Sequence, residues 1–123
     1  MTSGELVYAV NEHLKLTFWA MPGEGRLGAV TVQHALVSRD DGNYCKEFGL
    51  GATLKGQQLE ITTRLLKLPA IDRACVTYVL YQSFPDRPDS PDNRQHQRRF
   101  GPFWVSFGAG QHEQAVSHTI SLI

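Results

Sequence analysis

The sequence predicts an all-β fold, a single-domain antiparallel β-sandwich of seven to eight strands that uses the whole chain of 123 residues. Apolar side chains recur at every second residue in several segments, for example in 14–20 and 103–107. Side chains along an extended strand point alternately to opposite faces, so this pattern is typical of strands with one buried and one solvated face. Turn signals such as the Pro-Gly-Glu-Gly run at 22–25 separate the segments and favour antiparallel neighbours.

Eight segments are predicted as strands, each separated from the next by polar or glycine-containing residues. In chain order they are 5–10, 14–21, 28–38, 46–54, 58–67, 74–83, 99–108 and 114–123. The second, third, fourth and seventh segments alternate apolar and polar residues. The fifth and eighth also fit a helical spacing, but their β-branched residues favour strands. The sixth is apolar on both phases over 76–81, which predicts a central strand covered on both faces.

The charge balance excludes several classes of partner. Twelve Lys plus Arg against twelve Asp plus Glu give a formal net charge of zero, so no net electrostatic field attracts nucleic acid or an anionic membrane.

The first residues lack the basic start and apolar run of a signal peptide, which predicts a cytoplasmic protein. The chain ends in an apolar strand at 120–123, and an exposed apolar edge favours a homo-oligomer.

Two cysteines do not establish a disulfide framework. Cys45 and Cys75 fit no zinc or redox spacing, and we expect two reduced thiols, although a bridge between them stays open. No cofactor motif is present, so we expect no cofactor and no metal ligands.

The segment 84–98 is the one long irregular stretch, with three prolines and no apolar residue after Phe84. Loops of this length in compact domains are usually functional or disordered, so it is the first candidate for a binding site. Its polar candidates, with the residue that follows it, are Asp86, Arg87, Asp89, Asp92, Arg94, His96, Arg98 and Arg99. Calcium bound by the acidic residues at 86–92 is an alternative that the neighbouring arginines disfavour.

Trp19 and Trp104 occupy the opposite phase from the apolar residues around them, so both rings are expected to point outward. Exposed tryptophans suit a protein-binding or sugar-stacking surface. The alternative is that they lie under the long loop or in a second small core. Phe100, beside the arginine cluster, is predicted as a further apolar anchor.

The histidines offer a weaker enzymatic reading. If strands alternate in direction without interruption, His13, His112 and Asp72 lie together at one end of the sandwich with Asp40 and Asp41. The long loop then lies at the other end. No nucleophile, phosphate loop or acid pair accompanies these histidines.

The favoured function is therefore non-catalytic. The pattern is similar in general appearance to immunoglobulin-like or C2-like Greek-key sandwiches, but the Cys-Trp-Cys arrangement of true immunoglobulin domains is absent. We predict a recognition module that binds another protein or assembles with itself, through the 84–98 loop and the outward aromatics. The alternatives are a lectin-like carbohydrate-binding module and, third, a small hydrolase or metal-dependent enzyme.

Overall fold

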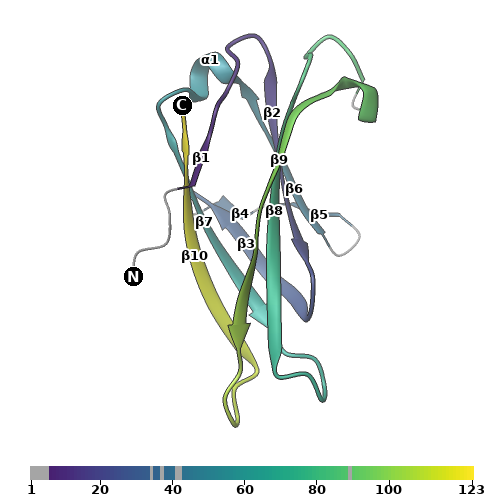
Figure 1. Cartoon of the computed structure of the whole chain (residues 1–123), viewed down its shortest axis with the longest axis vertical. Helices are drawn as coiled ribbons and strands as arrows, with labels where there is room; N and C mark the ends of the chain where they lie inside the picture. The colour runs from purple at the N-terminus through teal and green to yellow at the C-terminus, as the bar shows by residue number, and fades with distance from the viewer. Residues whose placement is uncertain (1–5, 34, 37, 41–42, 89) are drawn as a thin grey trace.

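Two five-stranded sheets pack against each other to form an all-β sandwich (Figure 1). The computed structural model describes residues 6–33, 35, 36, 38–40, 43–88 and 90–123. Sheet A has the strand order β1-β10-β7-β3-β4, and sheet B has the order β5-β6-β2-β8-β9. The elements are β1 (Leu6–Tyr8), β2 (Lys15–Pro22), β3 (Arg26–Val32), β4 (Ala35–Leu36), β5 (Ser38–Asp40), β6 (Asn43–Leu50), α1 (Gly51–Leu54), β7 (Gln58–Leu66), β8 (Arg73–Ser83), a 3-10 turn (Pro91–Asn93), β9 (Arg94–Ser106) and β10 (Glu113–Leu122).

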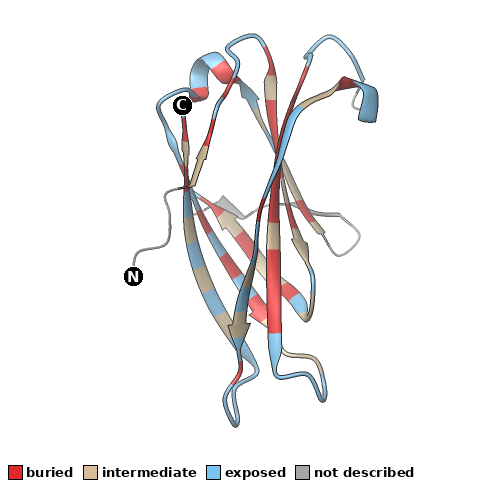
Figure 2. Cartoon of the chain, in the orientation of Figure 1, coloured by how far each residue is buried: buried red, intermediate tan, exposed pale blue. Residues whose placement is uncertain are grey.

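The core lies between the sheets and is built from the alternating apolar positions. Leu16 and Phe18 of β2 face Ile61, Leu65 and Ile120 of sheet A, and all five are fully buried. Figure 2 shows the alternation as red and pale bands along β7. Burial of each such side chain contributes about 1.5–3 kcal/mol to folding. The predicted fold class is confirmed.

β8 is the central strand that its doubly apolar sequence predicts. It pairs with β2 on one side and β9 on the other, and every residue from Ala74 to Ser83 except Thr77 is buried. Tyr78 and Leu80 point into the core. Val79 and Tyr81 point to the outer face of sheet B, where other side chains must cover them.

The last strand is not an edge. β1 pairs in parallel with β10, matching Leu6 with Ile120 and Tyr8 with Leu122, while β7 pairs on the other side. The other strand pairs in the described part of the chain are antiparallel. The prediction of an exposed apolar edge at 120–123 is therefore wrong, because the N-terminal strand covers it.

The segment predicted as one strand at 28–38 contains three. β3 ends at Val32, the chain reverses next to Gln33 with a φ of 53°, and β4 folds back against β3. β5 then joins the other sheet, where it pairs with β6. This additional reversal changes the direction of every later strand relative to the prediction.

As a result, the loop after β8 lies at the same end of the sandwich as the β1–β2 connection and α1 (Figure 1). The predicted separation of the β1–β2 connection from the long loop is wrong. The connections β7–β8 and β9–β10 lie at the opposite end, where the Lys67 amide donates to the His112 carbonyl at 2.8 Å.

The fourth predicted strand ends earlier than expected. β6 stops at Leu50, and 51–54 form the helical turn α1. The Gly51 amide donates to the Leu14 carbonyl at 2.8 Å, and a Cβ at Gly51 would collide with the Asn11 carbonyl. Glycine is therefore needed where the β1–β2 connection approaches this backbone.

The long loop is shorter than its sequence indicates. β9 begins at Arg94, so residues 94–98 extend sheet B, and the irregular segment is 84–93. Arg94 pairs with Ser83 and Arg98 with Leu80. β9 is an edge strand, where polar and charged residues are common, and this is why its polar sequence resembled a loop.

Candidate functional site

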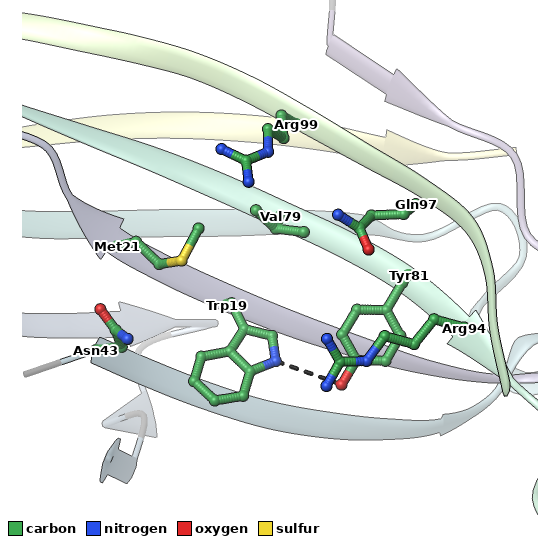
Figure 3. A pocket seen from close by; sticks show the side chains of 8 residues that line it. All are labelled: Trp19, Met21, Asn43, Val79, Tyr81, Arg94, Gln97 and Arg99. Carbon is green, nitrogen blue, oxygen red and sulfur yellow. Dashed lines mark hydrogen bonds between the residues drawn. The ribbon is translucent and has the colours of Figure 1, made fainter. Parts of the chain in front are cut away.

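The outer face of sheet B carries a pocket of about 270 Å³ (Figure 3). Trp19, Val79 and Arg99 lie side by side there, because β2 and β9 pair with β8 in register at these positions. We call this hollow the Trp19 pocket. It is lined by Trp19, Met21, Asn43, Val79, Tyr81, Arg94, Gln97 and Arg99.

Trp19 takes its place from the alternation of β2. Its neighbours Phe18 and Ala20 are fully buried in the core, so the indole of Trp19 points to the other side of the sheet, half-buried. The indole nitrogen donates to the Tyr81 hydroxyl at 3.4 Å, the contact drawn in Figure 3. The prediction of an outward ring is confirmed for Trp19, and the ring also belongs to a small apolar cluster on that face.

Tyr81 is covered by an arginine. The guanidinium carbon of Arg94 lies 4.7 Å from the centre of the Tyr81 ring, within cation–π range, and Tyr81 is only 1% exposed. A guanidinium that stacks on an aromatic face keeps its charge in contact with water while its stem covers apolar surface. Arg94 therefore acts as part of the wall of the pocket.

The rest of the rim is polar and includes a second cation. Arg99, Gln97 and Asn43 surround the apolar floor, and none of the eight lining residues is acidic. On the same face, Glu47 is held by Lys15 at 3.1 Å. The pocket thus combines a tryptophan ring with guanidinium and amide donors.

Trp104 lies on the same face but farther along the strands. It is 50% exposed and pairs with Cys75, four β8 positions from the residue that pairs with Trp19. The Arg73 guanidinium lies 4.9 Å from its ring centre and makes two hydrogen bonds to Glu24, at 2.9 and 3.2 Å. The hydrogen bond to Glu24 raises the pKa of Arg73. The outward orientation predicted for Trp104 is confirmed.

His96 and Arg98 line a different hollow, of about 440 Å³, where β9 meets β1. Tyr8 donates its hydroxyl hydrogen to the His96 carbonyl at 2.7 Å, and Arg98 donates to the Val7 carbonyl at 2.7 Å. Buried Gln82 donates to the Tyr8 hydroxyl at 3.2 Å. Burial raises the pKa of Tyr8. These groups connect β1 to sheet B, beside the Trp19 pocket, with which this hollow shares Gln97.

The 84–93 loop holds three further polar candidates at its surface. Asp86, Arg87 and Asp92 are exposed, and the Arg87 guanidinium lies 4.6 Å from the Phe84 ring centre. Asn93, 5% exposed, braces the loop from inside. Its side-chain oxygen accepts from the Phe84 amide at 3.1 Å, and its nitrogen donates to the Pro88 carbonyl at 3.1 Å. Asp89 lies outside the described residues.

Phe100 is not available as a surface anchor. It is 3% exposed, because it pairs with Tyr78 and points into the core, and the Arg98 guanidinium lies 4.8 Å from its ring centre. The prediction that placed Phe100 in the site is wrong. The phase of β9 could not be determined from its local pattern, since two bulges interrupt its register with β8.

The predicted histidine site does not form. His13 lies in the β1–β2 connection, at one end of the sandwich, whereas His112 and Asp72 lie at the other end (Figure 1). The Asp40 side chain and Asp41 lie outside the described residues. Across the described part of the chain, no group of three or more His, Cys, Asp or Glu residues could hold a metal ion. Cys45 and Cys75 are not joined by a disulfide.

One titratable cluster lies between the sheets. The Tyr78 hydroxyl is 2.7 Å from the Thr63 hydroxyl and 3.3 Å from Nδ1 of His118. The Phe103 ring stacks on the imidazole, with the ring centres 3.9 Å apart. Burial lowers the pKa of His118 and raises that of Tyr78 to about 12. The cluster is internal and joins β8, β9 and sheet A.

The structure thus brings together three of the predicted site residues, Trp19, Arg94 and Arg99. Tyr81, Val79 and Met21 were missed, although the apolar residues on both phases of 76–81 already indicated a hydrophobic outer side. No local sequence pattern marked Asn43 and Gln97 as pocket residues, because their place in the lining depends on which strands are neighbours in sheet B.

Comparisons with known proteins add no family to this description. No family model, no curated protein and no solved structure matches the chain. Among the residues that the structure describes, no helix has the length and apolar character needed to cross a membrane.

Proposed function

We propose that the protein is a non-catalytic recognition module that binds another protein through the outer face of sheet B. The observation that carries this proposal is the Trp19 pocket, which joins a half-buried tryptophan to two arginines on one sheet face. Tryptophan, tyrosine and arginine are the residue types that contribute most to binding at protein interfaces. The exposed ring of Trp104 extends the same face.

The proposed binding surface lies on sheet B and not at the tip of the loop. The arginines beside Trp19 come from β9, a paired strand, and their positions are fixed by hydrogen bonding to β8. Side chains on a rigid strand lose less conformational entropy on binding than side chains on a free loop. The loop residues Asp86, Arg87 and Asp92 would contribute polar contacts at the margin.

The test is affinity capture of a partner with the tagged protein and two matched double variants. Trp19→Ala with Arg99→Ala alters the outer face of sheet B, and Thr62→Ala with Ser117→Ala alters the outer face of sheet A. We expect the sheet B variant to lose the captured protein and the sheet A variant to retain it. Equal capture by both variants would contradict the proposal. Light scattering on the same samples reports whether the captured partner is a second copy of the chain.

Carbohydrate binding is a second candidate, and the pocket itself favours it. A half-buried indole beside the amides of Asn43 and Gln97 provides both a stacking surface and hydrogen-bond donors for sugar hydroxyls. A glycan array, followed by titration of tryptophan fluorescence with any sugar that binds, tests this candidate. If no glycan on the array binds and the tryptophan fluorescence does not change, carbohydrate binding is rejected.

A further inference from the structure

We infer that the partner segment is an extended chain in which one acidic residue lies two positions from a large apolar residue. It lies across the strands of sheet B, with its carboxylate at Arg99. This inference rests on the proposed function and names the chemistry of its partner. It is carried by the row of Trp19, Val79 and Arg99, which places one guanidinium level with an apolar floor.

The strand register places these three residues in one line across the sheet. Trp19 of β2 pairs with Val79 of β8, and Val79 pairs with Arg99 of β9. Paired strands lie about 4.8 Å apart, so the backbone of Arg99 is about 5 Å from that of Val79 and about 10 Å from that of Trp19. The ligand groups that meet Arg99 and the indole must therefore follow one another across the strands and not along β9.

The floor beside Arg99 is apolar. Val79 is 5% exposed, and Trp19 and Met21 are partly buried. All three line the Trp19 pocket, and Figure 3 shows the Arg99 side chain extending from β9 toward Val79. The pocket volume of about 270 Å³ is below the roughly 300–1,000 Å³ of small-molecule sites. A side chain that projects from a longer chain therefore fits the pocket better than a whole small-molecule ligand.

Arg99 is the charged group that the pocket offers to a ligand. It is exposed, and it makes no ion pair with a described acidic residue. None of the eight lining residues is acidic, and Glu47 on the same face is held by Lys15. The Arg94 guanidinium lies over Tyr81 and belongs to the wall of the pocket. Guanidinium binds carboxylate through paired, charge-assisted hydrogen bonds, so we assign one carboxylate to Arg99.

The distance between Arg99 and the floor sets the spacing in the ligand. Side chains two residues apart on an extended chain project from the same side, about 6.6 Å apart. That separation lies between the one-strand distance from Arg99 to Val79 and the two-strand distance to Trp19. With the carboxylate at Arg99, the apolar side chain would lie over Val79 and against the indole. Adjacent residues point to opposite sides and could not place both groups in the pocket.

The experiment uses the intrinsic fluorescence of Trp19. Trp104→Phe removes the other tryptophan, so that Trp19 alone reports binding in the otherwise complete chain. The probe is the capped peptide Ser-Thr-Glu-Thr-Leu-Thr-Ser. One control has glutamine in place of glutamate, and a second, Ser-Thr-Thr-Glu-Leu-Thr-Ser, has the same composition with the two groups adjacent. A third, Ser-Thr-Thr-Thr-Leu, is capped only at its amino end and offers a terminal carboxylate instead.

We expect the first peptide to shift the Trp19 emission and to bind at least about ten-fold more tightly than any control. The difference from the glutamine peptide should shrink as NaCl rises from about 0.05 to about 0.5 M, because exposed charges are screened. Arg99→Gln should weaken binding of the first peptide by about ten-fold, whereas Arg26→Gln, on sheet A, should leave it unchanged. Arg99→Glu should favour a peptide that carries lysine in place of the glutamate.

Failure of the first peptide to bind, equal binding of the glutamate and glutamine peptides, or no effect of Arg99→Gln would overturn the inference. Equal binding of the adjacent arrangement would overturn the spacing. Tighter binding of the third control would overturn the inference in favour of a terminal carboxylate. The proposed function can be judged separately. If the Trp19 and Arg99 variant loses its captured partner while the peptides do not discriminate, the inference fails and the proposed function remains.

Discussion

The outer faces of the two sheets differ in chemistry although their strands are built alike. On sheet A, β7 alternates between exposed polar and buried residues from Gln58 to Leu65, with Thr63 the one polar residue on the buried side. Thr62 and Ser117 lie 3.2 Å apart on the outer face of this sheet. On sheet B, the corresponding face carries Trp19 and, beneath the Arg94 guanidinium, Tyr81. Both faces point to solvent, but among the side chains whose burial is described, only those on the sheet B face include buried ones. The sheet B face therefore resembles a second small core with a charged rim.

This difference suggests how one half of a sandwich becomes specialised. A sheet needs only one apolar face to pack in a sandwich. On the outer face of sheet A, polar Thr and Ser side chains face the solvent and can hydrogen-bond to one another across the strands. The apolar residues on the second face of sheet B form a cluster that packing against sheet A does not itself require. Large exposed apolar patches mark interaction sites in many soluble proteins.

Among substitutions that test the difference between the two outer faces, Tyr81→Ala is expected to have the largest effect on the free energy of unfolding. Tyr81 is 1% exposed, so removing its ring should lower the free energy of unfolding by about 3 kcal/mol. Urea unfolding measures this. The matched change on sheet A, Thr62→Ala, should alter stability by less than about 0.5 kcal/mol. Similar losses for both would mean that the two faces are energetically alike.

A smaller loss is expected when the cover of that cluster is removed. Arg94→Ala takes away the guanidinium stacked on Tyr81 and should cost about 1 kcal/mol, because the ring becomes exposed. Arg64→Ala is the control on the outer face of sheet A, where the side chain pairs with exposed Glu113. A greater loss for Arg64→Ala than for Arg94→Ala in urea unfolding would break the comparison.

Acid is expected to lower the folding stability through the interior between the sheets and not through the outer face of sheet B. Burial lowers the pKa of His118 below its ordinary value of 6.5, so the unfolded chain binds a proton that the folded chain resists. The contribution of His118 is complete above pH 6.5 and is lost as the pH falls from there through the lowered pKa. We expect the unfolding midpoint to fall over this range. His118→Asn should flatten the profile there, and an unchanged slope would contradict this assignment.

The smallest effect is expected at the exposed tryptophan. Trp104→Phe should change the free energy of unfolding by less than about 0.5 kcal/mol, since half of the ring is in water and its arginine partner is exposed. Thermal unfolding followed by circular dichroism is sufficient to measure this. A loss above about 1 kcal/mol would show that Trp104 belongs to the apolar cluster around Trp19.

Much of the architecture could be predicted because it depends on local patterns. Alternation at 16, 18 and 20 predicted the buried face of β2 and therefore the outward direction of Trp19. Arg94 and Arg99 were found in a basic cluster, with Arg94 placed in the long loop and Arg99 at the start of the predicted strand 99–108. Their pairing with Ser83 and Val79 is a long-range contact, and no local period indicates it.

The sequence alone determined that the chain forms strands with one apolar face, that β8 is central and that Trp19 and Trp104 point outward. The tertiary structure decided which ends the loops occupy, that Phe100 is buried, and that Trp19 meets Arg94 and Arg99. The physical reason is that side-chain alternation is a local property of the backbone, whereas strand direction and register depend on individual events. A single reversal beside Gln33 inverted every later strand, and two bulges reset the phase of β9 against β8.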